Sequence, residues 1–185
     1  MTTEQEFAII DRVLAGHQHA YAELVNQYKN YGFTLALKIL NNRAEAEEAT
    51  QDAFVKAYHH LRNFNRNSKF STWLYRIVFN TAVSYKRKQK GTFQSIEKTE
   101  VRLYPESENQ LEKDDKKKFI TAAMTILSEA DRLALTLFYL KEQSLEEIAE
   151  ITGMQPNTAK VRIHRARQRL ADELTRLLNK EALTL

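Results

Sequence analysis

The chain has 185 residues with 28 Lys or Arg and 24 Asp or Glu, so its formal net charge is only +4. No run of 18 apolar residues occurs, and acids outnumber bases among the first dozen residues, so we expect neither membrane insertion nor a secretory signal. We therefore expect a cytoplasmic location. Cysteine is absent, and the adjacent His59 and His60 point to different helix faces, so we expect no disulfide, no metal and no cofactor.

The scarcity of turn-forming residues predicts an all-α chain. Only four Gly and two Pro occur, whereas good helix formers such as Ala, Leu, Glu and Lys abound. Between residues 91 and 118 the sequence has mixed charge, few large apolar side chains and no sustained period, which is typical of a solvated linker. We therefore expect two small helical domains, residues 1–90 and residues 119–185, joined by a flexible linker at 91–118.

Two amphipathic helices are predicted in the N-terminal domain. Apolar residues recur at helical spacing between Tyr21 and Ile39, which indicates one helix or a close pair broken near Gly32. Asn42 and Glu45 have the spacing of an N-cap and a third helical residue, so a second helix begins there. Its expected packing residues are Ala49, Ala53, Val55, Ala57, Tyr58 and Leu61.

The second helix has four acids near its beginning, which are Glu45, Glu47, Glu48 and Asp52. Acids near a helix N-terminus interact favourably with the helix dipole, so a solvated first turn explains them without any partner. The alternative is a docking face for a basic partner. Spacing alone leaves both interpretations open.

A stretch without acids follows this helix start. Residues 53–96 contain nine Lys or Arg and nine of the chain's 18 aromatic residues. Bases neutralise phosphates and aromatic rings stack on unpaired bases, so this composition favours binding to a single-stranded nucleic acid. Phe64 and Phe70 flank the polar segment 65–69, which we interpret as a loop and a candidate base-reading site. Trp73 lies at helical spacing with apolar neighbours, so we expect it to be part of the core even if its edge is functional.

The C-terminal domain has the pattern of a helix, a tight turn and a second helix. Ser128 begins one helix, and Ser144 forms a capping box with the glutamate three residues later. Gly153 ends this short helix, and Pro156 begins another that is expected to run to about residue 178.

Charge separates the two halves of this motif. Residues 119–155 hold two bases and six acids, whereas residues 156–170 hold five bases and no acid. A DNA-recognition helix needs this bias, because phosphates flank the major groove and Arg or Lys reads guanine edges. We therefore interpret the segment as a DNA-binding helix-turn-helix, with a solvated basic helix as the alternative.

Four segments together resemble the extracytoplasmic-function (ECF) sigma factors of bacterial RNA polymerase. They are, in chain order, AYAELVNQYKNYGFTLAL, RAEAEEATQDAFVKAYHHL, FNRNSKFSTWLYRIVFNTA and SLEEIAEITGMQPNTAKVRIHRARQRL. The resemblance implies a sigma region 2 domain and a sigma region 4 domain that direct promoter-specific transcription initiation. It also implies three partners: core RNA polymerase, bound at the clamp helices of its largest subunit, promoter DNA, and an anti-sigma factor.

The resemblance implies roles for particular residues. Those implied in polymerase binding are Glu45, Glu48, Gln51 and Asp52, which favours a docking face over a solvated turn. Those implied in reading and melting the minus-ten strand are Phe64, Asn65, Arg66, Asn67, Ser68, Lys69, Phe70, Trp73, Arg76 and Asn80. Those implied in binding the minus-thirty-five duplex are Asn157, Lys160, Val161, Arg162, His164 and Arg165. Gln155 and Val161 depart from the residues usual in the family, which leaves the exact bases open.

No enzyme is predicted, because the few His residues have no partner at the spacing of a catalytic site. Two other classes of protein compete with the sigma interpretation. A helix-turn-helix repressor explains residues 144–170 but not the acid-free aromatic stretch. A module that binds single-stranded RNA explains that stretch but not the helix-turn-helix. The sigma interpretation uses both.

Overall fold

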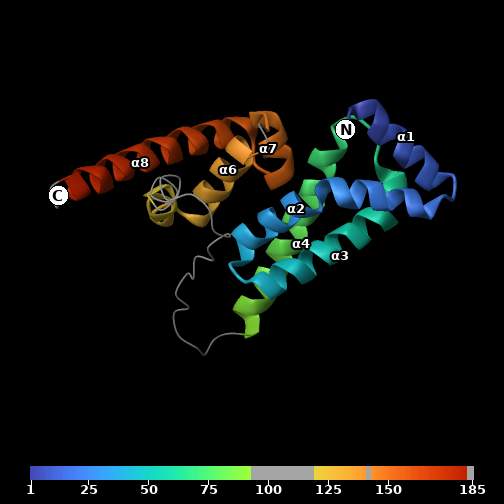
Figure 1. The fold of residues 1–185 in the computed structure, drawn as a ribbon, viewed down its shortest axis with the longest axis horizontal. Helices are drawn as coiled ribbons and strands as arrows, with labels where there is room; N and C mark the ends of the chain where they lie inside the picture. Colours follow the sequence, from blue (N-terminus) through green and yellow to red (C-terminus); the bar gives the residue numbers. More distant parts are fainter. Residues whose placement is uncertain (93–118, 141–142, 183–185) are drawn as a thin grey trace. The chain divides into compact units, whose positions relative to one another are not determined.

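The computed structural model describes residues 1–92, 119–140 and 143–182, and all regular secondary structure in these ranges is helical (Figure 1). The chain divides into two compact units. The N-terminal unit contains α1 (Thr3–Leu14), α2 (Tyr21–Leu40), α3 (Arg43–His59), α4 (Phe70–Thr92) and the short 3-10 turns η1 (Gln18–Ala20) and η2 (Leu61–Asn63). The C-terminal unit contains a helical segment at residues 119–125, α6 (Glu129–Leu140), most of α7 (Leu145–Thr152) and α8 (Pro156–Ala182).

Helix α2 is continuous, which decides between the two alternatives for the Tyr21–Ile39 region. Gly32 lies inside it, and a Cβ added there would come within 3.3 Å of the Phe54 ring on α3. The glycine therefore serves close helix packing and does not break the helix. Helix α2 ends instead at Asn41, which adopts the left-handed conformation common at helix C-termini.

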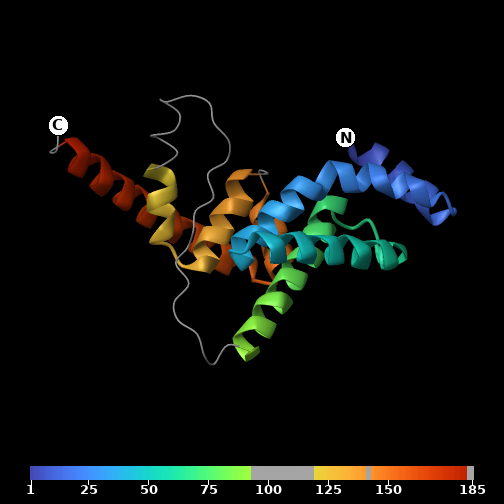
Figure 2. The same ribbon diagram turned by 60° about the horizontal axis from the view of Figure 1, so that its bottom comes forward.

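The predicted start of α3 is confirmed. Asn42 is its N-cap, and the side-chain oxygen of Asn42 accepts a hydrogen bond from the backbone N–H of Glu45 at 3.2 Å. The fully buried residues of α3 are small, namely Ala46, Ala49, Ala53 and Ala57, and Thr50 and Phe54 are also buried. Small side chains let α2 and α4 approach α3 closely, and Figure 2 shows α4 crossing α2 and α3. Val55 was expected to pack in this core, but it is 55% exposed.

An aromatic cluster fills the centre of the N-terminal unit. The Tyr28 ring lies 5.6 Å from Phe70 and 6.0 Å from Tyr75, and Tyr31 lies 4.4 Å from Tyr75. The Tyr28 hydroxyl donates a hydrogen bond to the buried Glu6 carboxylate, which fixes α1 on α2. Burial raises the pKa of Tyr28 and Tyr75 above the ordinary tyrosine value, because a charged phenolate is poorly solvated there.

The C-terminal unit follows the predicted capping pattern. Ser144 and Glu147 form a reciprocal capping box, with N···O distances of 2.8 and 3.2 Å. Gly153 has φ +72° and ends the turn of α7, and Pro156 is the first residue of α8. The buried residues of α6 and α8, which pack together, include Leu133, Ala134, Leu137, Ala159, Ile163 and Ala166.

The helix ends differ slightly from the expected domain boundaries. Helix α4 continues to Thr92, so the first two residues of the predicted linker are helical. The rest of the predicted linker, residues 93–118, lies outside the described residues. Helix α8 extends to Ala182, four residues beyond its expected end. Among the helices of the described ranges, none is long and apolar enough to span a bilayer.

Candidate nucleic-acid and protein interfaces

The segment 65–69 forms the predicted loop between η2 and α4. Asn65, Arg66, Asn67 and Lys69 are exposed, and Ser68 is half-buried. The side-chain oxygen of Asn65 accepts a hydrogen bond from the backbone N–H of Asn67 at 3.1 Å, which closes a compact polar turn. The loop therefore presents amide and cationic side chains to solvent, as a base-reading element requires.

The aromatic residues on either side of the loop are not at the surface. Phe64 is 6% exposed and Phe70 is fully buried, so neither ring can stack on a nucleic-acid base in this structure. Their rings lie 5.6 Å apart and anchor the two ends of the loop in the core. The prediction that Phe64 and Phe70 themselves contact DNA is therefore corrected. Sequence alone could not separate these roles, because aromatic rings serve both packing and stacking.

Trp73 connects the core to the surface beside the loop. Its ring lies 5.3 Å from Phe64 and 5.7 Å from Phe70, yet the residue is only partly buried. This placement confirms the expected dual environment. Trp73 is therefore partly accessible beside the loop.

A polar strip continues from Trp73 along α4. Arg76 and Asn80 are exposed and lie three and seven residues after Trp73, so the three side chains share one helix face. Arg87 extends the strip by two further turns and was not singled out from the sequence. Lys86 is partly buried, and its ammonium group donates to the carbonyl oxygen of Ile39 at 2.8 Å. The basic run at the end of α4 is therefore only partly available to a ligand.

The acidic residues of α3 divide between two neighbouring surfaces. Glu48 and Gln51 are exposed near the centre of the face opposite the alanine core. Glu45 is partly buried, and Asp52 lies toward α4, where its carboxylate accepts a 2.6 Å hydrogen bond from the Tyr85 hydroxyl. This hydrogen bond is the main cause of the raised pKa of Tyr85. Asp52 is thus also a structural contact between α3 and α4.

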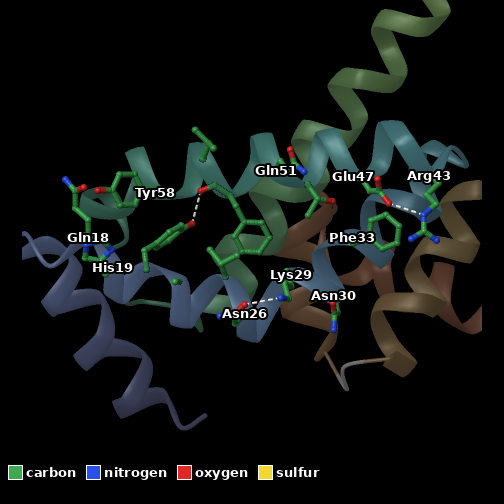
Figure 3. Close-up of a pocket in the computed structure, with 16 residues that line it drawn as sticks. Gln18, His19, Asn26, Lys29, Asn30, Phe33, Arg43, Glu47, Gln51 and Tyr58 are labelled. Atoms are coloured by element: carbon green, nitrogen blue, oxygen red, sulfur yellow. Dashed lines mark hydrogen bonds and ion pairs between the residues drawn. The ribbon is translucent and has the colours of Figure 1, made fainter.

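A groove of about 880 Å³ runs between α2 and α3 (Figure 3). Its apolar lining includes Val25, Phe33, Phe54 and Val55, and Gln51 lies at its edge. An ion pair of 3.0 Å between Arg43 and Glu47 borders one end. The lining also includes polar and charged residues of η1 and α2, which are Gln18, His19, Asn26, Lys29 and Asn30.

The groove and the exposed Val55 were missed at the sequence level. Val55 was counted as a core residue because it is apolar and lies among core alanines. Its position follows from helical phase, since it lies four residues after Gln51 and seven after Glu48 on the exposed face. An apolar centre with a charged rim is typical of a protein-protein interface.

The predicted DNA-binding face of α8 lies opposite its packing face. Ala159, Ile163 and Ala166 are buried, and the opposite face carries the exposed Asn157, Val161, His164, Arg165 and, unnoticed in the sequence, Gln168. Lys160 is exposed on the flank of this face. Val161 is 48% exposed, so an apolar side chain is available to contact a thymine methyl group.

Arg162 is the exception among the predicted DNA contacts on α8. It is only partly exposed, and its guanidinium lies 3.1 Å from a carboxylate oxygen of Asp131 on α6. Arg169 lies 3.1 Å from the other oxygen of the same carboxylate, whose side chain is 10% exposed. The structure thus places Arg162 in a contact that fixes α8 on α6, which weakens its prediction as a free DNA ligand. Asp131 was not singled out because nothing in the sequence pairs it with residues 31 and 38 positions later.

Replacing Asp131 with Ala should destabilise the C-terminal unit by about 2 kcal/mol. A nearly buried carboxylate that holds two guanidinium groups is lost, while the partly exposed arginines regain water and limit the cost. Trp73 is the chain's one tryptophan and belongs to the N-terminal unit. The urea concentration at which circular dichroism reports unfolding of the C-terminal unit should therefore fall. The unfolding midpoint reported by Trp73 fluorescence should be unchanged. An unchanged circular-dichroism transition would contradict the assigned contact.

Within the described residues, no group of three or more His, Asp or Glu side chains could hold a metal ion.

Two family models match the chain in the order of its two units. Residues 24–92 match the sigma-70 region 2 model, and residues 120–170 match a sigma-70 region 4 model. The first match covers α2, α3, the loop and α4. The second covers α6, α7 and the first half of α8.

Curated relatives extend this likeness over almost the whole chain. The ECF RNA polymerase sigma factor SigW of Bacillus subtilis is 35% identical, covering 89% of this chain and 94% of the relative. The RNA polymerase sigma-H factor of Pseudomonas aeruginosa is 31% identical, covering 96% and 98%. The ECF RNA polymerase sigma-E factor of Escherichia coli K12 is 30% identical, covering 93% and 95%.

Solved structures share the fold. The sigma factor RpoE of Bartonella quintana, crystallised with the anti-sigma factor NepR, is 25% identical and superposes with a TM-score of 0.69, covering 84% of this chain and 96% of that chain. CnrH, in complex with the cytosolic domain of CnrY, has a TM-score of 0.65 at 21% identity, covering 91% and 96%.

Proposed function

The chain belongs to the ECF sigma factors of RNA polymerase, which direct promoter-specific transcription initiation, and we propose how its two helical units divide that task. The N-terminal unit binds core polymerase and reads and melts the minus-ten element. The C-terminal unit binds the minus-thirty-five duplex through α8. The observation that carries this proposal is the separation of three exposed surfaces: the face of α3, the loop with α4, and the face of α8.

Polymerase binding is assigned to the exposed face of α3. Gln51 and the exposed Val55 line the apolar groove, and Glu48 lies on the same exposed face of α3, so the face combines charge with apolar area. Opposite charges steer two proteins together, and apolar burial holds them. The clamp helices of the largest polymerase subunit are the proposed partner. Asp52 and Glu45 border this face and contribute to its negative potential.

The minus-ten strand is assigned to the loop 65–69 and the adjacent strip of α4. Asn65, Asn67 and Lys69 supply polar groups that can bond to the edges and phosphates of an unpaired strand. Trp73 offers a ring edge, and Arg76 and Asn80 continue the surface along α4. Phe64 and Phe70 support this surface from the core.

Replacing both Asn65 and Asn67 with Ala should lower transcription from duplex promoters about fivefold and from premelted templates less. The loop acts by capturing a base that must first leave the stack, so an already open template relieves part of the loss. Run-off transcription on a duplex template and on a premelted template of the same sequence measures both values. Replacing Gln27 with Ala, an exposed amide of α2 outside this surface and outside the groove lining, is the control and should change neither. Equal losses on both templates would contradict the assigned role.

The minus-thirty-five duplex is assigned to the exposed face of α8. The separate Lys160→Ala and Arg165→Ala variants should each weaken promoter binding by about 1 to 3 kcal/mol for a base contact. For a phosphate contact, the slope of the logarithm of the binding constant against the logarithm of the salt concentration should instead become shallower by about one unit. Electrophoretic mobility shifts over a range of salt distinguish the two. Arg176 lies beyond the matched family segment and pairs with Glu173, so Arg176→Ala is a suitable control.

Regulation by an anti-sigma factor is also proposed. The Bartonella quintana relative of the same fold is bound to such a protein in its crystal. The groove between α2 and α3 and the basic face of α8 are the surfaces that an inhibitor must cover to block both polymerase and promoter. This chain would then act only after the inhibitor is released.

The protein is proposed to be a cytoplasmic regulatory subunit without catalytic activity of its own, because RNA polymerase performs the chemistry. A repressor and an RNA-binding module are the competing functions, and neither requires binding to core polymerase. Size-exclusion chromatography with purified core polymerase at low salt tests the difference. We expect co-elution of the isolated chain. Separate elution without any anti-sigma factor present would overturn the proposal.

A further inference from the structure

Helix α1 contacts the proposed base-reading loop through two side chains. Phe7 and Asp11 are four residues apart, so they lie on the same face of α1, and both contact Arg66. The Arg66 guanidinium forms an ion pair with the Asp11 carboxylate and lies 5.2 Å from the centre of the Phe7 ring. The Phe7 ring also lies 6.1 Å from Phe64, which anchors the loop in the core.

Arg66 has a backbone conformation that requires support. Its φ is +61°, in the left-handed region that an arginine rarely adopts. Within the described ranges the other non-glycine residue with positive φ is Asn41, a helix C-cap where this conformation is common. Arg66 has no such helix end to explain it. Strained residues of this kind persist where the surrounding contacts hold them, and they gather at functional sites.

Two sets of contacts support this conformation: the Asn65–Asn67 hydrogen bond closes the turn around Arg66, and the contacts to α1 hold the Arg66 side chain. The ion pair and the ring contact both act on the Arg66 side chain, and α1 also packs against η2, which leads into the loop. The matched region 2 segment begins at residue 24, so α1 lies outside it. Helix α1 therefore lies outside the matched segment, and its side chains reach the proposed DNA-reading loop.

We propose that Asp11 and Phe7 are positioning residues for promoter melting, and that they hold Arg66 so that Asn65 and Asn67 keep the geometry needed to capture a base. This inference rests on the proposed role of the loop. The same contact predicts the opposite change in activity if Arg66 itself binds DNA. Asp11 would then neutralise Arg66, and removing the carboxylate would increase activity.

The test uses the full chain assembled with core polymerase. The Asp11→Asn variant should lower run-off transcription from a duplex promoter about twofold to fivefold, within the range of about 1.4-fold to fivefold expected for loss of one exposed ion pair. Transcription from a premelted template should fall less. Because Asp11 is exposed, the unfolding midpoint followed by Trp73 fluorescence should change only slightly. The ratio of duplex to premelted activity is a readout that a general loss of stability does not move.

A control and a rescue variant complete the design. Arg12 and Glu23 form an exposed ion pair of 3.1 Å between α1 and α2, away from the loop, so Glu23→Gln should leave both activities unchanged. The Arg66→Asp variant alone should lower duplex activity. The combined Asp11→Arg and Arg66→Asp exchange restores an ion pair, and Asp tolerates the left-handed region, so activity should largely return.

Each outcome supports or overturns the inference. Higher activity of Asp11→Asn, unchanged activity, or an equal loss on both templates would overturn it, and so would an exchange no better than its single variants. Absence of any promoter-dependent transcript with the wild-type chain would instead overturn the proposed function itself. A normal wild-type transcript with a silent Asp11→Asn would overturn only the role of α1.

Discussion

The Phe70→Ala variant is expected to lose about 3 to 5 kcal/mol of stability in its N-terminal unit. Phe70 is fully buried, and its ring contacts Tyr28, Phe64 and Trp73, so truncation leaves a cavity among large rings. A small domain has only about 5 to 15 kcal/mol in total, so much of the unit should unfold at moderate urea concentrations. Urea unfolding followed by Trp73 fluorescence measures the effect.

Phe33→Ala provides a matched comparison for the same change of side chain. Phe33 lines the groove between α2 and α3 and is only partly buried, so we expect a loss of about 1 kcal/mol. If Phe70→Ala were as stable as Phe33→Ala, Phe70 would not be a core residue. Its direct contact with DNA would then have to be reconsidered.

The Glu48→Lys variant is expected to weaken binding to core polymerase by about 2 to 4 kcal/mol, or roughly 30-fold to 1000-fold in the dissociation constant. Glu48 lies on the exposed face of α3 beside Val55, where the proposed partner surface is basic. Reversal replaces attraction with repulsion at the centre of this contact. Fluorescence titration of labelled chain with core polymerase measures the change.

Glu48 is a cleaner position for this experiment than Asp52. The Asp52 carboxylate accepts the Tyr85 hydrogen bond between α3 and α4, so its reversal also disturbs the fold. Glu4 is an exposed acid in the first turn of α1, outside α3, so Glu4→Lys is a matched charge reversal that costs only about 0.3 to 1 kcal/mol through the helix dipole. If the Glu4→Lys and Glu48→Lys variants both bound core polymerase with wild-type affinity, α3 would not be part of the polymerase interface.

Local sequence signals predicted the helices well, because capping chemistry acts over three or four residues. The Asn42 cap, the capping box of Ser144 and the glycine turn at Gly153 all occur where expected. The excess of bases in residues 156–170 likewise predicts a helix with an exposed basic surface, and Lys160 and Arg165 are exposed, whereas Arg162 pairs with Asp131. The helical period determines which residues share a face, so a sequence with this period predicts which side chains lie together.

Contacts between residues distant in sequence were not predictable in the same way. Burial of Phe64 and Phe70 depends on Tyr28, Phe7 and Trp73, which come from three different helices. An aromatic residue beside a polar loop has the same sequence signature whether it packs inward or faces solvent.

Charged partners from other helices were equally hidden. The pairing of Arg162 with Asp131, and of Arg66 with Asp11, depends on how separate helices pack. The sequence therefore predicts six Lys or Arg residues as DNA ligands without regard to acids elsewhere in the chain. Two of them prove to be held, at least in part, by acids of the chain itself.

Run-off transcription with purified core polymerase tests the central claim most directly. Core polymerase alone is compared with core polymerase plus the full chain, on a linear template that carries a promoter served by the chain and on a template with its minus-ten and minus-thirty-five elements scrambled. The account predicts a transcript with one defined start that requires both the chain and the intact promoter. Transcription that is unchanged by adding the chain, or equal on the two templates, would contradict it.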